Sequence, residues 1–323
     1  MMTAIGLSRF RPGPEVIDLG QVLVHHLRSE GQTVIRSSRH VDPRLKMRLK
    51  FVAECMLSPD ATRLVEDADA RSPLGRLLAE WPDTAGFLLW PYQSTAWGPK
   101  ARVERVIEHV NAVSEIPGLS LTPDDKLVLA DLGSFSPDAS LILDRAPWLT
   151  REGHLTLSLF KDDFRAFTVS FSLFGKTTIG VFIGGLQGRQ TDGVLDLYRD
   201  LTKDFEGMRP RDFMLEALRM FAVKLGAREI QAVDDAHKIS RHKYFSGKNA
   251  PGLFYDDVWT ERGGNRIDDA HFSLPLGGSR RPLEDVAAKK RSMYRRRYEM
   301  LDAIEAALPS DLTSAERRHF DAR

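Results

Sequence analysis

The sequence predicts an α+β protein: a helical N-terminal half, then a mixed, mainly antiparallel sheet flanked by helices, and a long C-terminal amphipathic helix. Two observations support this prediction. Apolar and polar residues alternate over 155–159 and 167–173, as in half-buried antiparallel strands. Residues 176–234 then read as strand, loop, helix, strand. We expect a mostly helical region over residues 1–125 and an α/β domain over 126–323.

Composition limits the class of protein. The 46 Lys and Arg residues nearly balance the 45 Asp and Glu residues, so no global charge favours nucleic acid or membrane. Cys55 is the only cysteine, which excludes an internal disulfide and a zinc site built on several cysteines. No apolar run approaches the roughly 18 residues of a membrane-spanning helix, and the N-terminus lacks a signal-peptide pattern. We therefore expect a soluble, cytoplasmic protein without a transmembrane segment.

Helices dominate the expected first region. Asp42-Pro43 is a favourable helix start, because Asp suits the N-cap and Pro the first helical position. Apolar residues at helical spacing predict helices over 15–29, 42–56, 77–81 and 100–113.

The second region begins near residue 125, where the apolar runs become shorter. Strands are expected over 126–130, 141–143, 155–159, 167–173, 176–186, 229–233 and 271–275, which would be the last strand along the chain. Helices are expected over 210–225 and 282–308, and the polar tail after Pro309 is expected to fray. Residues 235–270 lack periodicity and read as a loop rich in aromatic residues.

The predicted helix over 210–225 begins with a candidate anion site. Arg209-Pro210-Arg211 places two guanidinium groups at its positive end, and Gly207 would allow a close backbone approach. Gln187 ends the preceding strand among three glycines and would offer an amide to a ligand. The alternative is that both arginines are solvated charges on a packing helix and that the glycines form a bulge.

Acid/base residues follow the predicted strand 229–233. Asp234 and His237 lie at its carboxyl end, which suits proton transfer, and Tyr255 lies in the aromatic segment beyond. The alternative is a structural histidine and a satellite core. The spacing fits no metal motif, so no metal is predicted.

The C-terminal helix carries the densest basic run. Its residues are candidates for binding phosphates of RNA or of anionic lipid headgroups. The alternative is a solvated face with salt bridges. The candidate residues are Lys289, Lys290, Arg291, Arg295 and Arg296.

The second half of the chain resembles the VirK/YbjX family of bacterial proteins, a domain of unknown function. The resemblance implies a bacterial protein linked to envelope properties, virulence and tolerance of antimicrobial peptides, and it implies no particular reaction. The residues that carry it are 183–188, 202–203, 207–210, 232–233, His237, 255–259, 274–275 and 289–298.

A looser resemblance is to GNAT-type acyltransferases, which hold acyl-coenzyme A with a strand, a basic glycine-containing loop, a helix and a strand. It implies a GNAT-like core and an N-acyltransferase that modifies a small molecule or an envelope component from the cytoplasmic side, peripheral to the inner membrane. Gln187, Gly207, Arg209 and Arg211 would contact acyl-coenzyme A, although the usual closely spaced glycines are missing after Gly207. Asp234, His237 or Tyr255 would handle the acceptor proton. The alternative is a non-enzymatic regulator that binds RNA or anionic lipid through the basic helix.

Overall fold

The computed structural model describes residues 44–80, 82–122, 124–242, 254–278 and 280–318. The helix predicted over 15–29, and Asp42-Pro43, lie outside the described residues. The chain divides into two compact units. The first comprises residues 1–90 with 98–104, and the second comprises 91–97 with 105–323.

The described part of the first unit is helical. Pro59 and Pro73 each begin a short helix, in keeping with the fixed φ of proline at a first helical position. Its buried side chains include Phe51, Cys55 and Leu77. The helices predicted at 42–56 and 77–81 are confirmed, with the second beginning earlier. The elements are α3 (Arg44–Leu57), α4 (Pro59–Glu66), α5 (Pro73–Glu80) and the 3-10 helix η1 (Pro82–Leu88).

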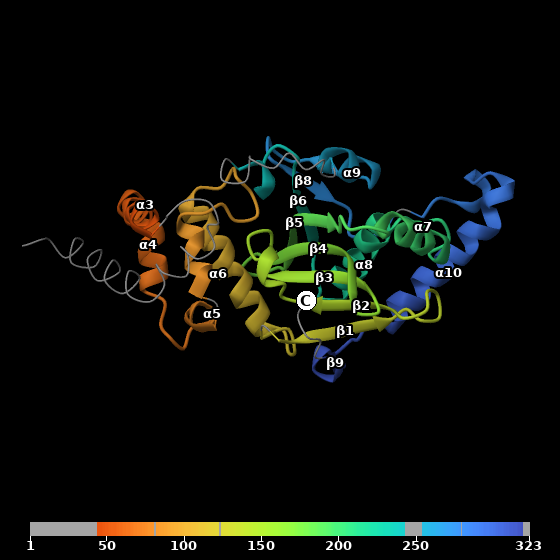
Figure 1. Ribbon diagram of the computed structural model, residues 1–323, viewed down its shortest axis with the longest axis horizontal. Coiled ribbons are helices and arrows are strands. Elements are labelled where there is room, and N and C mark those ends of the chain that lie inside the picture. The colour runs from red at the N-terminus through yellow and green to blue at the C-terminus, as the bar shows by residue number, and fades with distance from the viewer. Residues whose placement is uncertain (1–43, 81, 123, 243–253, 279, 319–323) are drawn as a thin grey trace, which may run out of the picture. The chain divides into compact units, whose positions relative to one another are not determined.

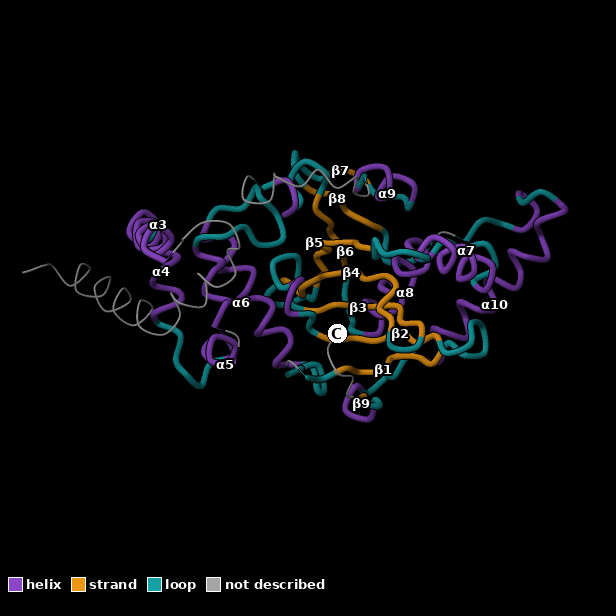
Figure 2. Tube along the Cα trace, viewed as in Figure 1, coloured by secondary structure: helices purple, strands orange, loops and turns teal. Residues whose placement is uncertain are grey.

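The second unit contains a nine-stranded mixed sheet in the described part of the chain (Figures 1 and 2). Its strand order is β7-β8-β6-β5-β4-β3-β2-β1-β9, and only β5 and β6 pair in parallel. The strands are β1 (Lys126–Asp131), β2 (Ala139–Asp144), β3 (Leu155–Lys161), β4 (Phe164–Phe174), β5 (Gly180–Gly188), β6 (Glu229–Val233), β7 (Asn265–Arg266), β8 (His271–Leu274) and β9 (Arg317–Arg318).

Helices connect and cover this sheet. Helix α8 packs across β3, β4 and β5, and eleven of its residues are buried, including Phe221, whose ring lies edge-on to Phe171 of β4 at 6.4 Å. Two short 3-10 helices, η2 (Pro147–Leu149) and η3 (Ile239–Arg241), lie in the connections. The α-helices are α6 (Pro99–Glu115), which runs from the first unit into the second, α7 (Val194–Asp204), α8 (Pro210–Lys224), α9 (Tyr255–Glu261) and α10 (Arg291–Ala307).

The α+β class and the predicted strands of the sheet are confirmed, but strands β3 and β4 are not half-buried. Both faces of these strands are buried, and their polar residues bond to one another inside the protein. Ser158 Oγ lies 3.0 Å from Thr168 Oγ1, and Arg165 Nη1 donates to Asp144 Oδ1 at 3.1 Å. The side chains at the polar positions of these two strands therefore form a buried, hydrogen-bonded layer.

The C-terminal helix begins at Arg291 and not at Pro282. Residues 283–290 instead form two single-turn 3-10 helices, η4 (Leu283–Asp285) and η5 (Ala288–Lys290). The Arg291 guanidinium donates to the carbonyls of Val286 and Glu284. These carbonyls therefore bond to a side chain in place of the backbone N–H groups of a continued helix. The tail also differs from the prediction, because Arg317–Arg318 adds β9 to the edge of β1.

Four further helices and strands were not predicted from the sequence. Helix α4 lies between the helices predicted at 42–56 and 77–81, and helix α7 occupies the stretch read as polar loop. Helix α9 lies inside the predicted aromatic loop, and β7 extends the sheet beyond β8. Among the described residues, no helix is both long and apolar enough to cross a membrane.

Candidate functional site

The two parallel strands β5 and β6 separate within the sheet. Their pairing ends at Ile183 and Ala232, while β5 continues to Gly188 against β4. Gly184 is an extra residue in the β4–β5 ladder, because Ile183 pairs with Phe171 and Gly185 pairs with Ser170. Such a bulge redirects the strand and is common beside functional sites. The backbone of β5 beyond Ile183 therefore has a free edge on the β6 side.

Tyr255, the first residue of α9, reaches this free edge. Its hydroxyl accepts a hydrogen bond from the Leu186 N–H at 2.8 Å and donates to the Leu186 carbonyl at 3.3 Å. The side chain is buried, and Lys238 Nζ lies 4.6 Å from the centre of its ring. Burial, then the negative charge of Glu152, raise the pKa of Tyr255, so the hydroxyl keeps its proton near neutral pH.

Glu152 lies over the glycine pair of β5. A Cβ atom on Gly184 would come within 2.0 Å of the Glu152 carbonyl oxygen, and one on Gly185 within 1.9 Å of Oε2. The amide of Gln187 donates to both carboxylate oxygens, at 2.6 and 2.5 Å. Gly184 is thus needed because any side chain there would meet the Glu152 backbone, and a side chain on Gly185 would displace the Glu152 carboxylate.

The Glu152 carboxyl group titrates near neutrality. Withdrawal from water raises its pKa to about 7, against the opposing effects of the Gln187 hydrogen bond and the positive charge of Lys238. A carboxyl group of this pKa is half ionised at neutral pH and can both accept and return a proton.

A buried polar network lies behind Glu152. Tyr92 Oη is 2.7 Å from both His154 Nδ1 and Ser172 Oγ, and Ser172 Oγ accepts from the His154 N–H at 3.0 Å. His154 stacks on His109 at 5.2 Å, and His109 Nδ1 accepts from the Leu173 N–H at 3.1 Å. Burial lowers the pKa of His109 to about 3 and that of His154 well below its usual value. Both imidazoles are therefore neutral in the folded protein.

Gln93 connects the network to the strands. Its side chain donates to the Phe182 carbonyl at 3.2 Å and to the Glu152 carbonyl at 3.5 Å, and its own N–H donates to the Arg151 carbonyl at 2.7 Å. These bonds hold the segment that carries Glu152 against β5.

The structure brings two of the three predicted catalytic residues into direct contact. Asp234 is buried and accepts from the N–H and Nδ1 of His237, at 2.8 and 2.9 Å, and from Arg266 at 3.2 Å. Tyr255 bonds instead to the neighbouring Asp235, to which its N–H donates at 3.3 Å. Its hydroxyl belongs with Glu152 and β5.

The predicted donor-binding residues are distributed over three places. Gln187 contacts Glu152, and Gly207 has a left-handed φ of +77° before α8. Arg209 is exposed, and its carbonyl begins α8. Arg211 donates to Asp212 at 3.0 Å and to Glu261 at 2.7 Å, so its charge is matched internally. Their role in binding acyl-coenzyme A stays a prediction.

The basic run is partly used within the protein. Arg296 holds both carboxylate oxygens of Glu206, at 2.8 and 2.7 Å, and Arg291 binds backbone carbonyls. Lys289, Lys290 and Arg295 are exposed. Binding of RNA or anionic lipid to this face stays a prediction. No group of metal-ligating side chains occurs among the residues described by the structure.

Glu152 was not predicted from the sequence. It lies in a loop 32 residues before Gly184, with no local motif around it, and only the tertiary contact with the two glycines identifies it.

Comparison with known proteins identifies a family but finds no solved structure that matches. An "Uncharacterized protein" of Haemophilus influenzae is 34% identical over 155 residues, 47% of this chain and 51% of the relative. The "Uncharacterized protein YbjX" of Escherichia coli is 36% identical over 132 residues, 41% of this chain and 39% of the relative. A second Haemophilus influenzae protein is 29% identical over 180 residues, 56% of this chain and 60% of the relative. The chain thus spans between 39% and 60% of the length of these relatives. No solved structure matches at a significant level.

The family model described as "Protein of unknown function (DUF535)" matches residues 41–310, which is most of the chain. With the YbjX relative, this match confirms the family predicted from the motifs of the second half. The chain belongs to the DUF535 family of proteins of unknown function, the VirK/YbjX family.

Proposed function

We propose that the protein transfers an acyl group from an acyl-coenzyme A thioester to an amine, with Glu152 as general base and Tyr255 as general acid. The observation that carries this proposal is a carboxyl group of pKa about 7 at the point where two parallel strands separate. A base with this pKa takes up a proton efficiently near neutral pH. The Tyr255 hydroxyl, which keeps its proton, supplies the matching acid.

The order of elements supports a likeness to GNAT-type acyltransferases. Strand β5 is followed by the exposed loop 189–193, helices α7 and α8, and the parallel strand β6. The sequence resemblance depends on a strand, loop, helix, strand order with the loop over residues 207–211, and helix α7 is an additional element within this order. Beyond Ile183, β5 does not pair with β6, and on that side Leu186 bonds to the Tyr255 hydroxyl. Strand backbone outside a ladder binds extended ligands that carry amide groups. The pantetheine arm of coenzyme A is such a ligand.

The loop 189–193 is the better candidate for the donor's phosphates. It contains Arg189, which is exposed, and Gly193, whose φ of +77° begins α7. Arg211 is less suited, because Asp212 and Glu261 already match its charge. The guanidinium of Arg189 and the positive end of the α7 dipole would together attract a diphosphate.

The proposed residues account for both proton transfers. A bound thioester supplies an electrophilic carbonyl carbon. The amine nitrogen forms a bond to this carbon and the carbon–sulfur bond breaks. The amine proton passes to Glu152, and the departing thiolate takes the proton of Tyr255. Proton exchange with solvent then restores the Glu152 carboxylate and the Tyr255 hydroxyl.

The acceptor class follows from the family's proposed link to the bacterial envelope. We propose that the acceptor is a primary amine, either of a small molecule or of an envelope component such as an aminated lipid headgroup. A change in such an amine would alter the positive charge of the cell surface, which would connect the reaction with antimicrobial-peptide tolerance and virulence.

Release of free thiol from acyl-coenzyme A tests the proposal. The purified chain is mixed with acetyl- or palmitoyl-coenzyme A and with spermidine or phosphatidylethanolamine vesicles, and thiol is measured with a chromogenic reagent. Cys55 contributes little background, because it is buried and its pKa is raised to about 11 by burial. Thiol release that requires the amine is expected.

Two variants assign the reaction to the site. Glu152→Gln should lower kcat by about a hundredfold or more, the usual contribution of a general base. Glu104→Gln makes the same chemical change at an exposed position of α6 and should leave kcat unchanged. The proposal fails if no donor is consumed and if no acyl-coenzyme A raises the melting temperature of the chain.

A further inference from the structure

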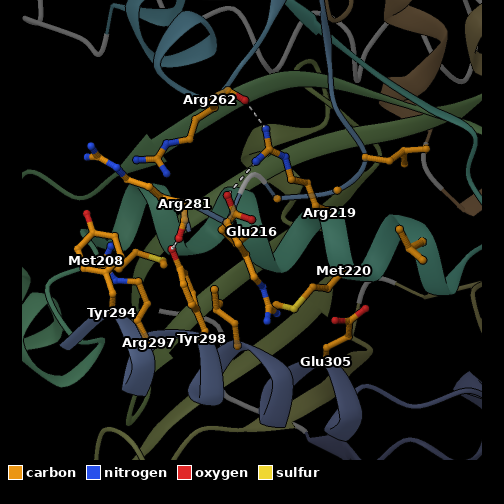
Figure 3. A pocket seen from close by; sticks show the side chains of 16 residues that line it. Met208, Glu216, Arg219, Met220, Arg262, Arg281, Tyr294, Arg297, Tyr298 and Glu305 are labelled. Carbon is orange, nitrogen blue, oxygen red and sulfur yellow. Dashed lines mark hydrogen bonds and ion pairs between the residues drawn. The ribbon is translucent and has the colours of Figure 1, made fainter. Parts of the chain in front are cut away.

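A second candidate site shares no residue with the Glu152 site. It is a pocket of about 430 Å³ in the second unit, between α8, α10 and the loop that follows β8 (Figure 3). Its lining is rich in arginine, with Arg219, Arg262, Arg280, Arg281 and Arg297, and contains two carboxylates, Glu216 and Glu305.

Three of the arginines are matched by carboxylates. Arg219 bonds to Glu216 at 2.8 Å, Arg262 to Asp212 at 2.8 Å, and Arg280 to Asp302 at 3.0 Å. These pairs fix the positions of their guanidinium groups.

The charges of the other two arginines are not matched in this way. Arg297 donates to the main-chain carbonyl of Glu206, at 3.0 and 2.7 Å, while the carboxylate of Glu206 is held by Arg296. Arg281 is exposed and forms no ion pair with a residue described by the structure. The pocket therefore has excess positive charge.

This charge is gathered at one end of the pocket. Figure 3 shows Arg262, Arg281, Tyr294 and Arg297 toward that end and Glu305 at the other. The guanidinium carbon of Arg297 lies 4.3 Å from the centre of the Tyr294 ring, which fixes its orientation. The Nε atom of Arg262 is buried and has no hydrogen-bond partner among the described residues. An anion at this end would meet several oriented donors.

The remaining wall is apolar. Met208, Met220, Leu276 and Leu301 line the pocket beside the ring of Tyr298. The Tyr298 hydroxyl donates to the Arg281 carbonyl at 2.8 Å, which holds the loop after β8 against α10. A ligand that fills this space would carry both a compact anionic group and an apolar or aromatic body.

We propose that this pocket binds a phosphate monoester with an apolar body, the phosphate resting between Arg281, Arg297 and Tyr294. Guanidinium groups match phosphate oxygens in geometry as well as in charge, and an apolar body gains by leaving water against the methionine and leucine side chains. Such a monoester is found in soluble aryl or alkyl phosphates and in the headgroup of phosphatidate.

Binding to the full chain is measured by calorimetry with inorganic phosphate, phenyl phosphate and dihexanoyl phosphatidate below its micelle concentration. Phenyl phosphate should bind at least about tenfold more tightly than inorganic phosphate, since burial of a ring exceeds the 1.4 kcal/mol that a tenfold change requires. Equal affinity for the two would overturn the assignment of an apolar body. Preference for phosphatidate over phenyl phosphate would identify a lipid as the source of the monoester.

A matched pair of variants locates the site. Arg281→Gln should weaken phenyl phosphate binding at least about tenfold, as expected for loss of a charged hydrogen-bond donor. Arg295→Gln removes the same charge from an exposed position of α10 outside the pocket and should leave binding unchanged. Tyr298→Phe keeps every charge and should weaken binding less than Arg281→Gln. Absence of binding, or equal losses in the two arginine variants, would overturn the proposal.

Discussion

The carboxylate of Glu152 occupies the space that a side chain on Gly185 would fill. A Cβ atom at Gly185 would lie 1.9 Å from Glu152 Oε2, and one at Gly184 would lie 2.0 Å from the Glu152 carbonyl oxygen. The two neighbouring glycines thus meet different parts of the same residue. Gly185 faces the movable end of the side chain, while Gly184 faces rigid backbone.

Alanine substitutions at these two glycines should have different effects. Gly185→Ala should push the Glu152 carboxylate aside and lower acyl transfer at least about tenfold, with a modest loss of stability. Gly184→Ala should instead destabilise the fold by about 2 kcal/mol or more, because backbone cannot move away. Urea denaturation and thiol release measure the two effects. Gly98→Ala is the control, since a Cβ there meets nothing within 4 Å. Equal stability losses in the two variants would contradict this account.

The pKa of Glu152 predicts how stability varies with pH. Its folded-state pKa of about 7 exceeds the ordinary value of 4.5, so the folded protein binds more protons than the unfolded chain between these values. Glu152 therefore makes the protein less stable as pH rises from about 4.5 to 7, and adds no further change above that. Glu152→Gln should be more stable relative to the wild type at pH 8 than at pH 5, by about 2–3 kcal/mol.

Denaturant titrations of both proteins at pH 5, 6, 7 and 8 measure this difference. The same group sets the pH dependence of the proposed reaction, in which kcat should rise with pH through about 7 as the base ionises. A stability difference that is constant across this range would show that the carboxyl group is already ionised at pH 5.

The positions of the strands were predictable from the local pattern of the sequence, but the burial of both their faces was not. The alternation over β3 and β4 gave the correct strands, yet Ser158 and Thr168 are buried and bond to each other. A small hydroxyl residue that faces water and one that pairs inside a protein look the same in a sequence. Burial of the second face depends on other parts of the chain, which no local pattern contains.

The candidate site was predictable only in part, at Gln187 in the glycine-rich strand, at the end of β6 and in the aromatic segment. Asp234 and His237 could be named because β6 ends before them, and Tyr255 because it lies in an aromatic segment. Glu152 could not be named, because its environment is made by Gly184, Gly185 and Gln187 of β5. Glu152 itself precedes β3, and β4 lies between β3 and β5 in the sheet. Its raised pKa is a property of that tertiary contact.

Replacement of Tyr255 separates its structural role from its chemical role. Tyr255→Phe removes the bonds to the Leu186 N–H and carbonyl and should cost about 1–2 kcal/mol of stability. Tyr198 provides a matched comparison, because its hydroxyl also bonds to backbone, the Ala166 carbonyl at 2.8 Å and the Arg189 N–H at 2.7 Å. Tyr198→Phe should have a similar stability cost.

The two tyrosine variants should differ in kinetics. Loss of the proton donor should lower kcat of Tyr255→Phe about a hundredfold. Tyr198→Phe loosens the loop that carries Arg189 and should raise KM for the donor, with little effect on kcat. Equal kcat values for the two variants would remove Tyr255 from the reaction.

The buried histidine pair predicts sensitivity to acid. The folded-state pKa values of His109 and His154 lie below the ordinary value of 6.5, so the unfolded chain binds more protons than the folded protein below that pH. Stability should therefore fall as pH drops below about 6.5, by about 1.4 kcal/mol per pH unit for each histidine. Glu152 acts in the opposite direction between about 4.5 and 7, so the effect is best measured in the Glu152→Gln background.

In that background, His154→Gln should remove about one proton from the pH dependence of the unfolding free energy between pH 4.5 and 6.5. Tyr92→Phe is the control, because it removes the hydroxyl that bonds to His154 Nδ1 and leaves both imidazoles in place. It should lower stability by a similar amount at every pH and keep the slope. A slope that survives His154→Gln unchanged would mean that His154 is already protonated in the folded protein, which its stacking on His109 in a buried site opposes.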